Sequence, residues 1–388
     1  MALSASHQVS GTYQPSNNDN IWVVTESSTG VTSNFNFKFL CDVKNLSGTL
    51  LSRLKVPIHY DSTSRGVFNI SKVLSSYTTY DWDYDDAAAS GCTNSVQAYT
   101  LAFGYEYSTG ATSDIEVSTG VTTVTGNKVW NAALHPLDFL TYAQEDYLMA
   151  SGSTANFLTS LTSKRIHSDQ KDWLYALHNS NISTLDIAFS GGGTTQVSGT
   201  SNDITRFPIG ANIPGGIPSG TTSYTITPKA SGGNTIGSVF TITIDDRCSK
   251  YDSVDLFFLN KYGAVESFRF DRVRRDNFTS VKNTYRKNPY TLNNTSGTYT
   301  YNRLEHSKSD YYNEMTQRTI LNSNFITEAE AVWLKQLINS PRVWMYDTEL
   351  IPINILTSDY EQKYHINDKV FNLTLEVEHS FIDKAQVL

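Results

Sequence analysis

The chain has 388 residues, of which 39% are hydrophobic, 12% aromatic and only 18% charged. This length accommodates two or three domains. Its 23 tyrosines exclude a disordered protein, which has few aromatic residues and a large net charge. The formal net charge of −8 argues against nucleic acid as a partner, because phosphate binding needs a surplus of Lys and Arg.

Alternating apolar and polar residues predict β-strands along most of the chain. In one early strand the alternation puts Phe35, Phe37 and Phe39 on the same face. Low charge with many Tyr and Thr residues suits pleated, half-buried surfaces, so we predict a mainly β protein. The clearest predicted strands are 21–26, 34–43, 54–60, 96–107, 223–227, 239–244, 254–260, 265–270, 343–346, 351–356 and 370–379.

Two segments of the N-terminal half have a helical period. Residues 136–149 carry an apolar stripe, and Pro136 suits the first position of a helix. Residues 169–178 follow Ser168, a residue type that caps helix N-termini, and form the second predicted helix. The stripe of the first helix consists of Leu137, Leu140, Tyr147 and Leu148.

The composition changes over residues 191–222, which are rich in Gly, Ser, Thr and Pro. Such a segment is typical of a linker or a long loop. We therefore predict two domains, an N-terminal β-rich domain over 1–190 and a C-terminal β-rich domain over 223–388.

A third helix is predicted near the C-terminus. Thr327 and Glu330 have the spacing of a capping box, in which each side chain bonds the backbone N–H of the other residue. The pattern predicts a helix over 328–339 that ends before Pro341.

A short pattern, W-L-x-x-L-x-N-S, occurs twice, at residues 173–180 and 333–340. One interpretation is a duplicated unit of β-sheet plus one packing helix, with one copy on each side of the linker. The other is two unrelated amphipathic helices with similar ends. The sequence leaves both open.

Sequence motifs of common enzymes are absent. The chain lacks the G-x-S-x-G, G-x-x-x-x-G-K-[ST], H-E-x-x-H and dinucleotide-binding G-x-G-x-x-G patterns, and its eight His residues include no i, i+4 pair. We therefore predict a protein that is not an enzyme and binds no cofactor.

The cysteines and the N-terminus bear on where the chain folds. Cys41, Cys92 and Cys248 lie far apart, which predicts buried, reduced thiols in place of a disulfide framework or a zinc site. The first residues lack the pattern of a secretory signal, and no apolar run reaches the roughly 20 residues that span a bilayer. We expect a protein that folds in a cytoplasm and has no membrane segment.

The acidic and aromatic residues at 80–86 are the strongest polar cluster. On an extended strand Asp81, Asp83 and Asp85 would share a face, which makes them weak candidates for a metal site. An EF-hand is excluded, because Asp86 and Cys92 stand where that loop needs Gly and Glu. A solvated acidic loop is the favoured interpretation. The neighbouring aromatic residues, Trp82 and Tyr84, could stack on sugar rings or cover the edge of a core.

Four arginines form the only basic cluster: Arg269, Arg272, Arg274 and Arg275. Acidic residues are interspersed among them, so we expect salt bridges within or between subunits in preference to contacts with DNA. Together with Trp82 and Tyr84, these arginines are the candidate interface residues.

The order of segments resembles that of virion structural proteins of tailed bacteriophages that infect Bacteroidetes-type bacteria. The resembling segments are 34–39, 66–74, 157–159, 255–263, and the Trp333 helix followed by Pro352 and the last strand. The resemblance implies a tail or baseplate subunit with tail-tube-like architecture: tandem β-sandwiches, each with a packing helix, that assemble into symmetric rings. Partners would be copies of the chain and other virion proteins, in particles assembled in the host cytoplasm.

Two other functions remain open at this stage. Abundant Tyr and Trp would also suit a receptor- or carbohydrate-binding module of the virion surface, with a host surface glycan as its partner. A hydrolase of surface polysaccharide would need a pair of carboxylates at a defined separation, and no pattern in the sequence marks one.

Overall fold

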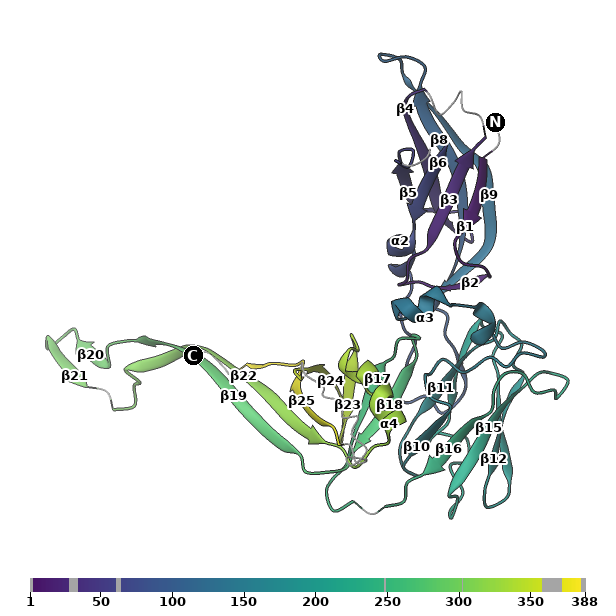
Figure 1. Ribbon diagram of the computed structural model, residues 1–388. Coiled ribbons are helices and arrows are strands. Elements are labelled where there is room, and N and C mark those ends of the chain that lie inside the picture. The colour runs from purple at the N-terminus through teal and green to yellow at the C-terminus, as the bar shows by residue number, and fades with distance from the viewer. Residues whose placement is uncertain are drawn as a thin grey trace. The chain divides into compact units, whose positions relative to one another are not determined.

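The computed structural model describes residues 3–27, 34–60, 64–247, 249–301, 303–357 and 372–384. The fold is mainly β, with several sheets arranged as tandem sandwich-like domains, which confirms the predicted fold class. The chain divides into two compact units, Met1–Arg247 with Leu259–Ser267, and Cys248–Phe258 with Phe268–Leu388. Figure 1 labels the elements of both.

The N-terminal part of the first unit is a sandwich of two sheets around an aromatic core. Phe39, Val43 and Phe103 lie at its centre and are fully buried. The five-stranded sheet has the order β2 (Tyr13–Pro15), β9 (Ile115–Trp130), β8 (Val96–Ser108), β4 (Phe35–Asn45) and β5 (Leu50–Val56). The three-stranded sheet has the order β1 (Leu3–His7), β3 (Ile21–Glu26) and β6 (Arg65–Asn69), and the short helix α2 (Ser71–Ser75) follows it.

The predicted row of three phenylalanines is correct for two of them. Phe37 and Phe39 are buried, whereas Phe35 is 56% exposed. The pairing of β4 with β8 shifts register between Phe35 and Lys38, and Asn36 has a positive φ of 55°. This bulge breaks the strict alternation, which turns Phe35 away from the core.

The second part of the first unit also has two sheets. One has the order β10 (Ser163–Ile166), β16 (Phe240–Ile244), β15 (Ser223–Lys229), β12 (Thr184–Phe189) and β13 (Thr194–Ser198). The other has the order β11 (Trp173–Leu177), β14 (Ile204–Pro208) and β7 (Ser90–Gly91). Because β7 comes from the N-terminal part of the sequence, its pairing with β14 joins the two parts of this unit.

The helix predicted over 169–178 is wrong, because Trp173–Leu177 is strand β11. All five residues of the strand are buried, and a continuous apolar run of this length fits a covered strand better than a helix with one wet face. The matching pattern at 333–340 is helical. The repeated pattern therefore does not mark a duplicated structural unit.

The linker predicted over 191–222 is also wrong, and so is the domain boundary placed there. The segment contains β13 and β14, and every residue of β14 is buried. Its glycines lie in turns between strands, which is why its composition resembles that of a linker. The two units divide near Arg247 instead.

The helix predicted over 136–149 is reduced to two short pieces. Helix α3 spans Pro136–Leu140, with proline at its start as expected, and a 3₁₀ turn spans Gln144–Asp146. The predicted apolar stripe does not face a core in its first turn, because Leu137 is 67% exposed and Leu140 is 77% exposed.

The second unit is built on one large sheet. Its order is β18 (Val265–Phe270), β17 (Val254–Leu259), β23 (Val343–Tyr346), β24 (Leu350–Ile355), β25 (Thr374–His379), β22 (Lys308–Asn322) and β19 (Arg275–Arg286), with β26 (Asp383–Lys384) also paired to β22. The first two residues of the strand predicted over 370–379 lie outside the described residues.

The C-terminal helix is confirmed as two consecutive short helices, α4 (Glu328–Trp333) and α5 (Lys335–Ile338). Both bonds of the predicted capping box between Thr327 and Glu330 are present. The ring of Trp333 packs on those of Phe258 and Phe268, at centroid distances of 5.3 and 6.0 Å, which holds the helix against the sheet.

Two predicted thiols are confirmed as buried and free, Cys41 and Cys92, whereas Cys248 lies outside the described residues. Burial raises the pKa of both thiols well above the ordinary value. Within the described part of the chain, no helix is long and apolar enough to cross a membrane.

A buried histidine makes the first unit sensitive to acid. Burial lowers the pKa of His178 from 6.5 to about 4, although the charge of Asp203 opposes the shift. The ring contacts the Thr205 hydroxyl at 2.7 Å and accepts from the Ile182 N–H at 3.2 Å, which fixes a neutral tautomer. Between pH 6.5 and about 4 only the unfolded chain gains this proton, so stability falls with pH across that window.

We expect the His178→Gln variant to lose much of this dependence. In the native protein the shift corresponds to about 3 kcal/mol of unfolding free energy lost on acidification. Urea unfolding of the first unit, followed at several pH values across the window, measures the slope. His135→Asn is the matched control, because His135 is an exposed residue that caps α3 and Asn can also cap. An unchanged slope in the His178 variant would contradict the assignment.

Candidate assembly interface

The acidic run is a loop whose first carboxylate is fully used by the chain itself. Asp81 accepts from the backbone N–H groups of Asn94 at 2.7 Å and Ser95 at 2.9 Å. It also accepts from the side chains of the same two residues, at 2.6 and 3.1 Å. This saturates both carboxylate oxygens, so Asp81 anchors the loop to the start of β8.

The three metal candidates are not brought together. Asp83 accepts from the backbone N–H of Asp85 at 3.0 Å, and Asp85 lies 3.7 Å from the Lys171 ammonium group. In the described ranges, no group of three or more His, Cys, Asp or Glu residues is arranged to hold a metal ion. The extended strand that would have aligned these carboxylates does not form, because residues 81–86 are turn and irregular loop.

The aromatic residues of the loop cover the edge of a core. The rings of Trp82 and Tyr84 lie 5.8 and 6.2 Å from that of Trp173 on β11, both edge-on. The ammonium group of Lys171 lies 3.9 Å from the centre of the Tyr84 ring. These contacts favour the interpretation in which the rings cover the edge of a core. Both side chains stay half-buried, so the prediction that Trp82 and Tyr84 belong to an interface is left as a prediction.

The buried side chain of Arg206 holds the loop through contacts with two of its aspartates. Its side chain is only 4% exposed, and its guanidinium group forms an ion pair with Asp86 and donates to the carbonyl of Asp81 at 3.3 Å. Burial lowers the pKa of Arg206, and the charges of Asp83 and Asp81 oppose this. The acidic run therefore neutralises a buried arginine of the same unit.

The basic cluster is also mostly satisfied within its own unit. Arg269 makes two parallel bonds to Asp255, at 2.7 and 2.9 Å, with both side chains nearly buried. Arg274 lies between Asp347 and Asp276, with 3.1 Å to the latter. These pairs confirm the expectation of salt bridges for Arg269 and Arg274.

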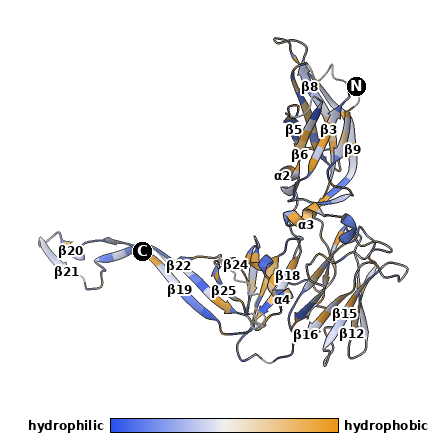
Figure 2. Cartoon of the chain, in the orientation of Figure 1, coloured by the Kyte–Doolittle hydropathy of each residue, from blue (hydrophilic) through white to orange (hydrophobic). Residues whose placement is uncertain are grey.

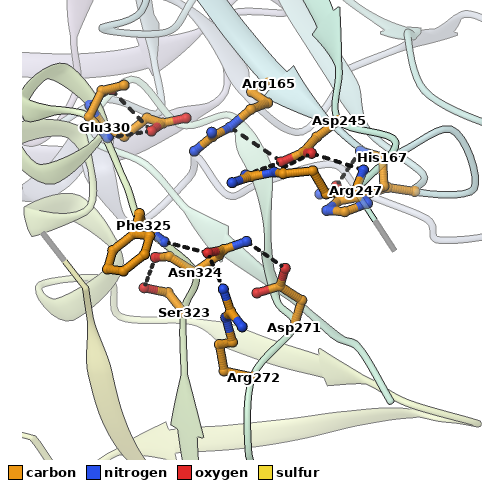
Figure 3. Close-up of polar contacts among 12 residues, drawn as sticks. Arg165, His167, Asp245, Arg247, Asp271, Arg272, Ser323, Asn324, Phe325 and Glu330 are labelled. Carbon is orange, nitrogen blue, oxygen red and sulfur yellow. Dashed lines mark hydrogen bonds and ion pairs between the residues drawn. The ribbon is translucent and has the colours of Figure 1, made fainter. Parts of the chain in front are cut away.

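The remaining two arginines have different environments. Figure 3 shows Asn324 between two charged groups: it accepts from Arg272 at 2.8 Å and donates to Asp271 at 3.1 Å. Arg275 is exposed at the first position of β19. Arg275 therefore stays a candidate interface residue.

A separate cluster in Figure 3 belongs to the first unit. Arg247 makes two bonds to Asp245, and Arg165 approaches the same carboxylate at 3.8 Å. The hydrogen bonds from Arg247 lower the pKa of Asp245 to about 2, against the effect of burial. This carboxylate directly follows β16 and is held by two arginines of its own unit.

A long hairpin of the second unit, residues 275–322, has many exposed side chains, and we call it the arm. Its two shaft strands, β19 and β22, pair from Arg275 opposite Ile320 to Arg286 opposite Lys308. All twelve residues of β19 are exposed. Figure 1 shows this pair continuing into a second hairpin, β20 (Tyr290–Asn293) and β21 (Thr298–Tyr301).

One face of this terminal hairpin is aromatic. Register places Tyr290 opposite Tyr301 and Leu292 opposite Tyr299, so the four side chains share a side, which we call the tyrosine face. Their exposed fractions are 54%, 60%, 46% and 71% in that order. The other side carries Thr and Asn, and residues 288–302 include no charged residue.

More apolar side chains are exposed along the shaft of the arm. They are Phe278, Val281, Tyr285, Tyr311 and Tyr312. In Figure 2 the shaft strands are coloured mainly for polar residues. An extended apolar surface rimmed by polar groups is typical of a protein interaction site.

The strands predicted from the sequence include none within 275–322, so the arm was missed. The signal was present: Tyr290 and Leu292 alternate with Thr, and Tyr299 and Tyr301 alternate with Thr on the other side of a turn that ends at Gly297. Gly297 has a positive φ of 61°, as hairpin turns require. Two such runs around a Gly-containing turn predict a hairpin.

Comparisons with known proteins identify no family. No protein family and no curated protein matches the sequence. Among solved structures, a bacterial ice-binding adhesin matches with a TM-score of 0.21 and 10% identity, over 84% of this chain and 93% of that one. The α-2-macroglobulins of E. coli and Salmonella match with TM-scores of 0.20 and 0.19, at 8% and 7% identity, over 97% and 96% of this chain and 20% and 23% of theirs. Likenesses this weak carry no argument about function.

The loop geometry predicts which aspartate matters for stability. Asp81→Ala leaves two backbone N–H groups without their acceptor, so we expect a loss of about 2–3 kcal/mol in the unfolding free energy of the first unit. Asp83→Ala is the matched control, because its side chain is exposed, and we expect a much smaller loss. Denaturant unfolding measures both. Equal losses, or stabilisation of the native protein by added calcium, would contradict this account of the loop.

Proposed function

We propose that the chain is a non-enzymatic structural subunit of a bacteriophage virion, in the tail or baseplate, that works by symmetric assembly with neighbouring subunits. The observation that carries this proposal is the arm, in which every residue of β19 and all four side chains of the tyrosine face are exposed. The resemblance of the sequence to tail and baseplate proteins supports the same function. The arm would be the part of each subunit that engages a neighbour in particles assembled in the host cytoplasm.

The physical argument starts from the instability of an isolated ribbon. A two-stranded hairpin in water is at best marginally stable, because it is a single narrow layer with no further strand beside it and no element packed on its faces. Ordering each residue of the ribbon costs conformational entropy, and the chain recovers little apolar burial in return. A neighbouring subunit that covers the arm supplies the missing burial, so binding and ordering stabilise each other.

The chemistry of the tip suits a protein neighbour. It is uncharged, so burying it requires no desolvation of charge. Its tyrosines provide large contact area with one hydroxyl each, as the central residues of protein interfaces do. Its outer strand edges offer backbone groups that an adjoining sheet can pair.

Binding to a host surface glycan is the alternative function, and the same tyrosine face is the feature that favours it. Aromatic rings stack on sugars, and three tyrosines at an exposed tip could form such a platform. The rings of Tyr290 and Tyr301 meet edge-on, however, at 73° and 5.3 Å, so they do not form one flat surface. This geometry suits an interdigitated protein contact better.

The first experiment is the mass of the purified native chain by light scattering, with electron microscopy of the same sample. We expect discrete symmetric oligomers whose population grows with concentration. Tyr299→Glu, at the most exposed position of the tyrosine face, should weaken assembly about tenfold or more, because it places a charge at the centre of the contact. The matched control is Thr300→Glu, on the opposite side of the same strand, which adds the same charge away from the tyrosine face.

The outcomes separate the two functions. Rings that Tyr299→Glu disrupts and Thr300→Glu preserves would support assembly through the tyrosine face. A native chain that stays monomeric at high concentration and binds a glycan on an array, with binding lost in Tyr299→Glu, would replace the proposal by the glycan-binding alternative. Equal effects of both variants would remove the tyrosine face as the contact.

A further inference from the structure

The first unit buries an ion pair that neither the loop nor the arm uses. Lys164 lies on β10 and Asp172 directly precedes β11, so the pair bridges the two sheets of the second sandwich. The Lys164 side chain is 6% exposed and that of Asp172 is 0% exposed, and Nζ lies 2.7 Å from Oδ2. Water has almost no access to either group.

The contact is close but is not an ordinary hydrogen bond. Among the described residues Oδ2 of Asp172 accepts no hydrogen bond of normal geometry, although Nζ of Lys164 is at hydrogen-bonding distance. The other oxygen, Oδ1, accepts from the backbone N–H of Ser267 at 3.2 Å. The two oxygens of the carboxylate therefore have different roles.

The backbone around Asp172 is held on both sides. Its N–H donates to the Asn212 side chain at 3.3 Å, and its carbonyl accepts from the N–H of Ile209 at 2.9 Å. Gly210 packs so closely against this turn that a Cβ there would lie 2.7 Å from the Asp172 nitrogen. The carboxylate is thus presented to Lys164 in a fixed position, as a reacting group must be.

The surroundings of the pair are poorly suited to two charges. Tyr224 and Tyr175 are almost fully buried, and burial, with the Asp172 charge as a smaller cause, raises the pKa of both hydroxyls well above the ordinary value. Both charges of an ion pair in such a site bear a desolvation cost. Conversion into a neutral group would remove that cost.

We propose that Lys164 and Asp172 condense into an intramolecular amide, a covalent cross-link between the two sheets. One ammonium proton passes to the carboxylate, and the freed Nζ lone pair attacks Cγ. The tetrahedral carbon then releases Oδ2 with a second proton from nitrogen, so that one C–O bond breaks, one C–N bond forms and one water leaves. The charges cancel, and no oxidant, reductant or co-reactant is needed.

The geometry assigns a role to each neighbour. Oδ2 is the leaving oxygen, because it is the atom next to Nζ and is otherwise unbonded. Oδ1 carries the negative charge of the tetrahedral state, and the Ser267 N–H donates to it as an oxyanion-stabilising group does. Exclusion of water from the site favours the amide over the separated charges and slows its hydrolysis.

Mass spectrometry of the purified full chain tests this proposal. We expect a denatured mass lower than the sequence mass by one water. Trypsin should release a branched peptide in which residues 129–165 are joined through Lys164 to residues 172–206, because cleavage after the modified lysine is blocked. Lys164→Arg is the matched variant: it keeps the positive charge, but its guanidinium group is too poor a nucleophile, so it should show the full mass and no branched peptide.

A native chain that is folded by circular dichroism, yet yields separate peptides cleaved after Lys164, would overturn the proposal. Loss of one water without the branched peptide would do the same, because dehydration at another Asp or Asn gives that mass. The result for the native chain decides the matter even where the arginine variant fails to fold.

Discussion

A two-stranded ribbon is a single layer that cannot bury its own side chains, and this constraint determines which residues of the arm are exposed. Each side chain of β19 points to one of two faces, and all twelve side chains are exposed in the described part of the chain. Elsewhere the same sequence buries strands completely, as in β11 and β14. The arm is therefore not a region where the fold lacks apolar residues. Its apolar residues are present, and in the described structure they lie exposed.

The charged groups follow the opposite rule. Arg206, Lys164 and Arg269 are almost buried, and each has a carboxylate partner within its own unit. A buried charge without a partner would cost several kcal/mol, so each of these cations requires its carboxylate. The charged clusters identified in the sequence are mostly paired inside a unit in this way, whereas the tip of the arm is uncharged and aromatic. The surface that we propose as the contact therefore carries none of the charge that drew attention in the sequence.

The sequence predicted those features that depend on neighbours along the chain. The capping box of Thr327 and Glu330 is a local device, and so is proline at the start of α3. The mainly β fold also followed, because alternation survives in most strands. Features that depend on distant neighbours were missed. Trp173–Leu177 was taken for a helix because its burial comes from strands and loops remote in sequence, and Leu137 was placed in a core that the short helix does not reach.

The candidate site shows the same limit. Asp81 and Asp83 were grouped because they are close in sequence, but their side chains accept hydrogen bonds from different parts of the chain. Asp81 binds the backbone N–H of Asn94, which anchors the loop to β8, whereas Asp83 binds the N–H of Asp85 within the loop itself. The arm was missed for a related reason. Alternation reports that a strand has two unlike faces, and it cannot report whether anything covers the apolar one. The tyrosine face has the sequence pattern of a half-buried strand, yet its four side chains are exposed in the described part of the chain. Under the proposed function this pattern matches the state in which a neighbour covers the face, as expected for a segment that becomes fully ordered on binding.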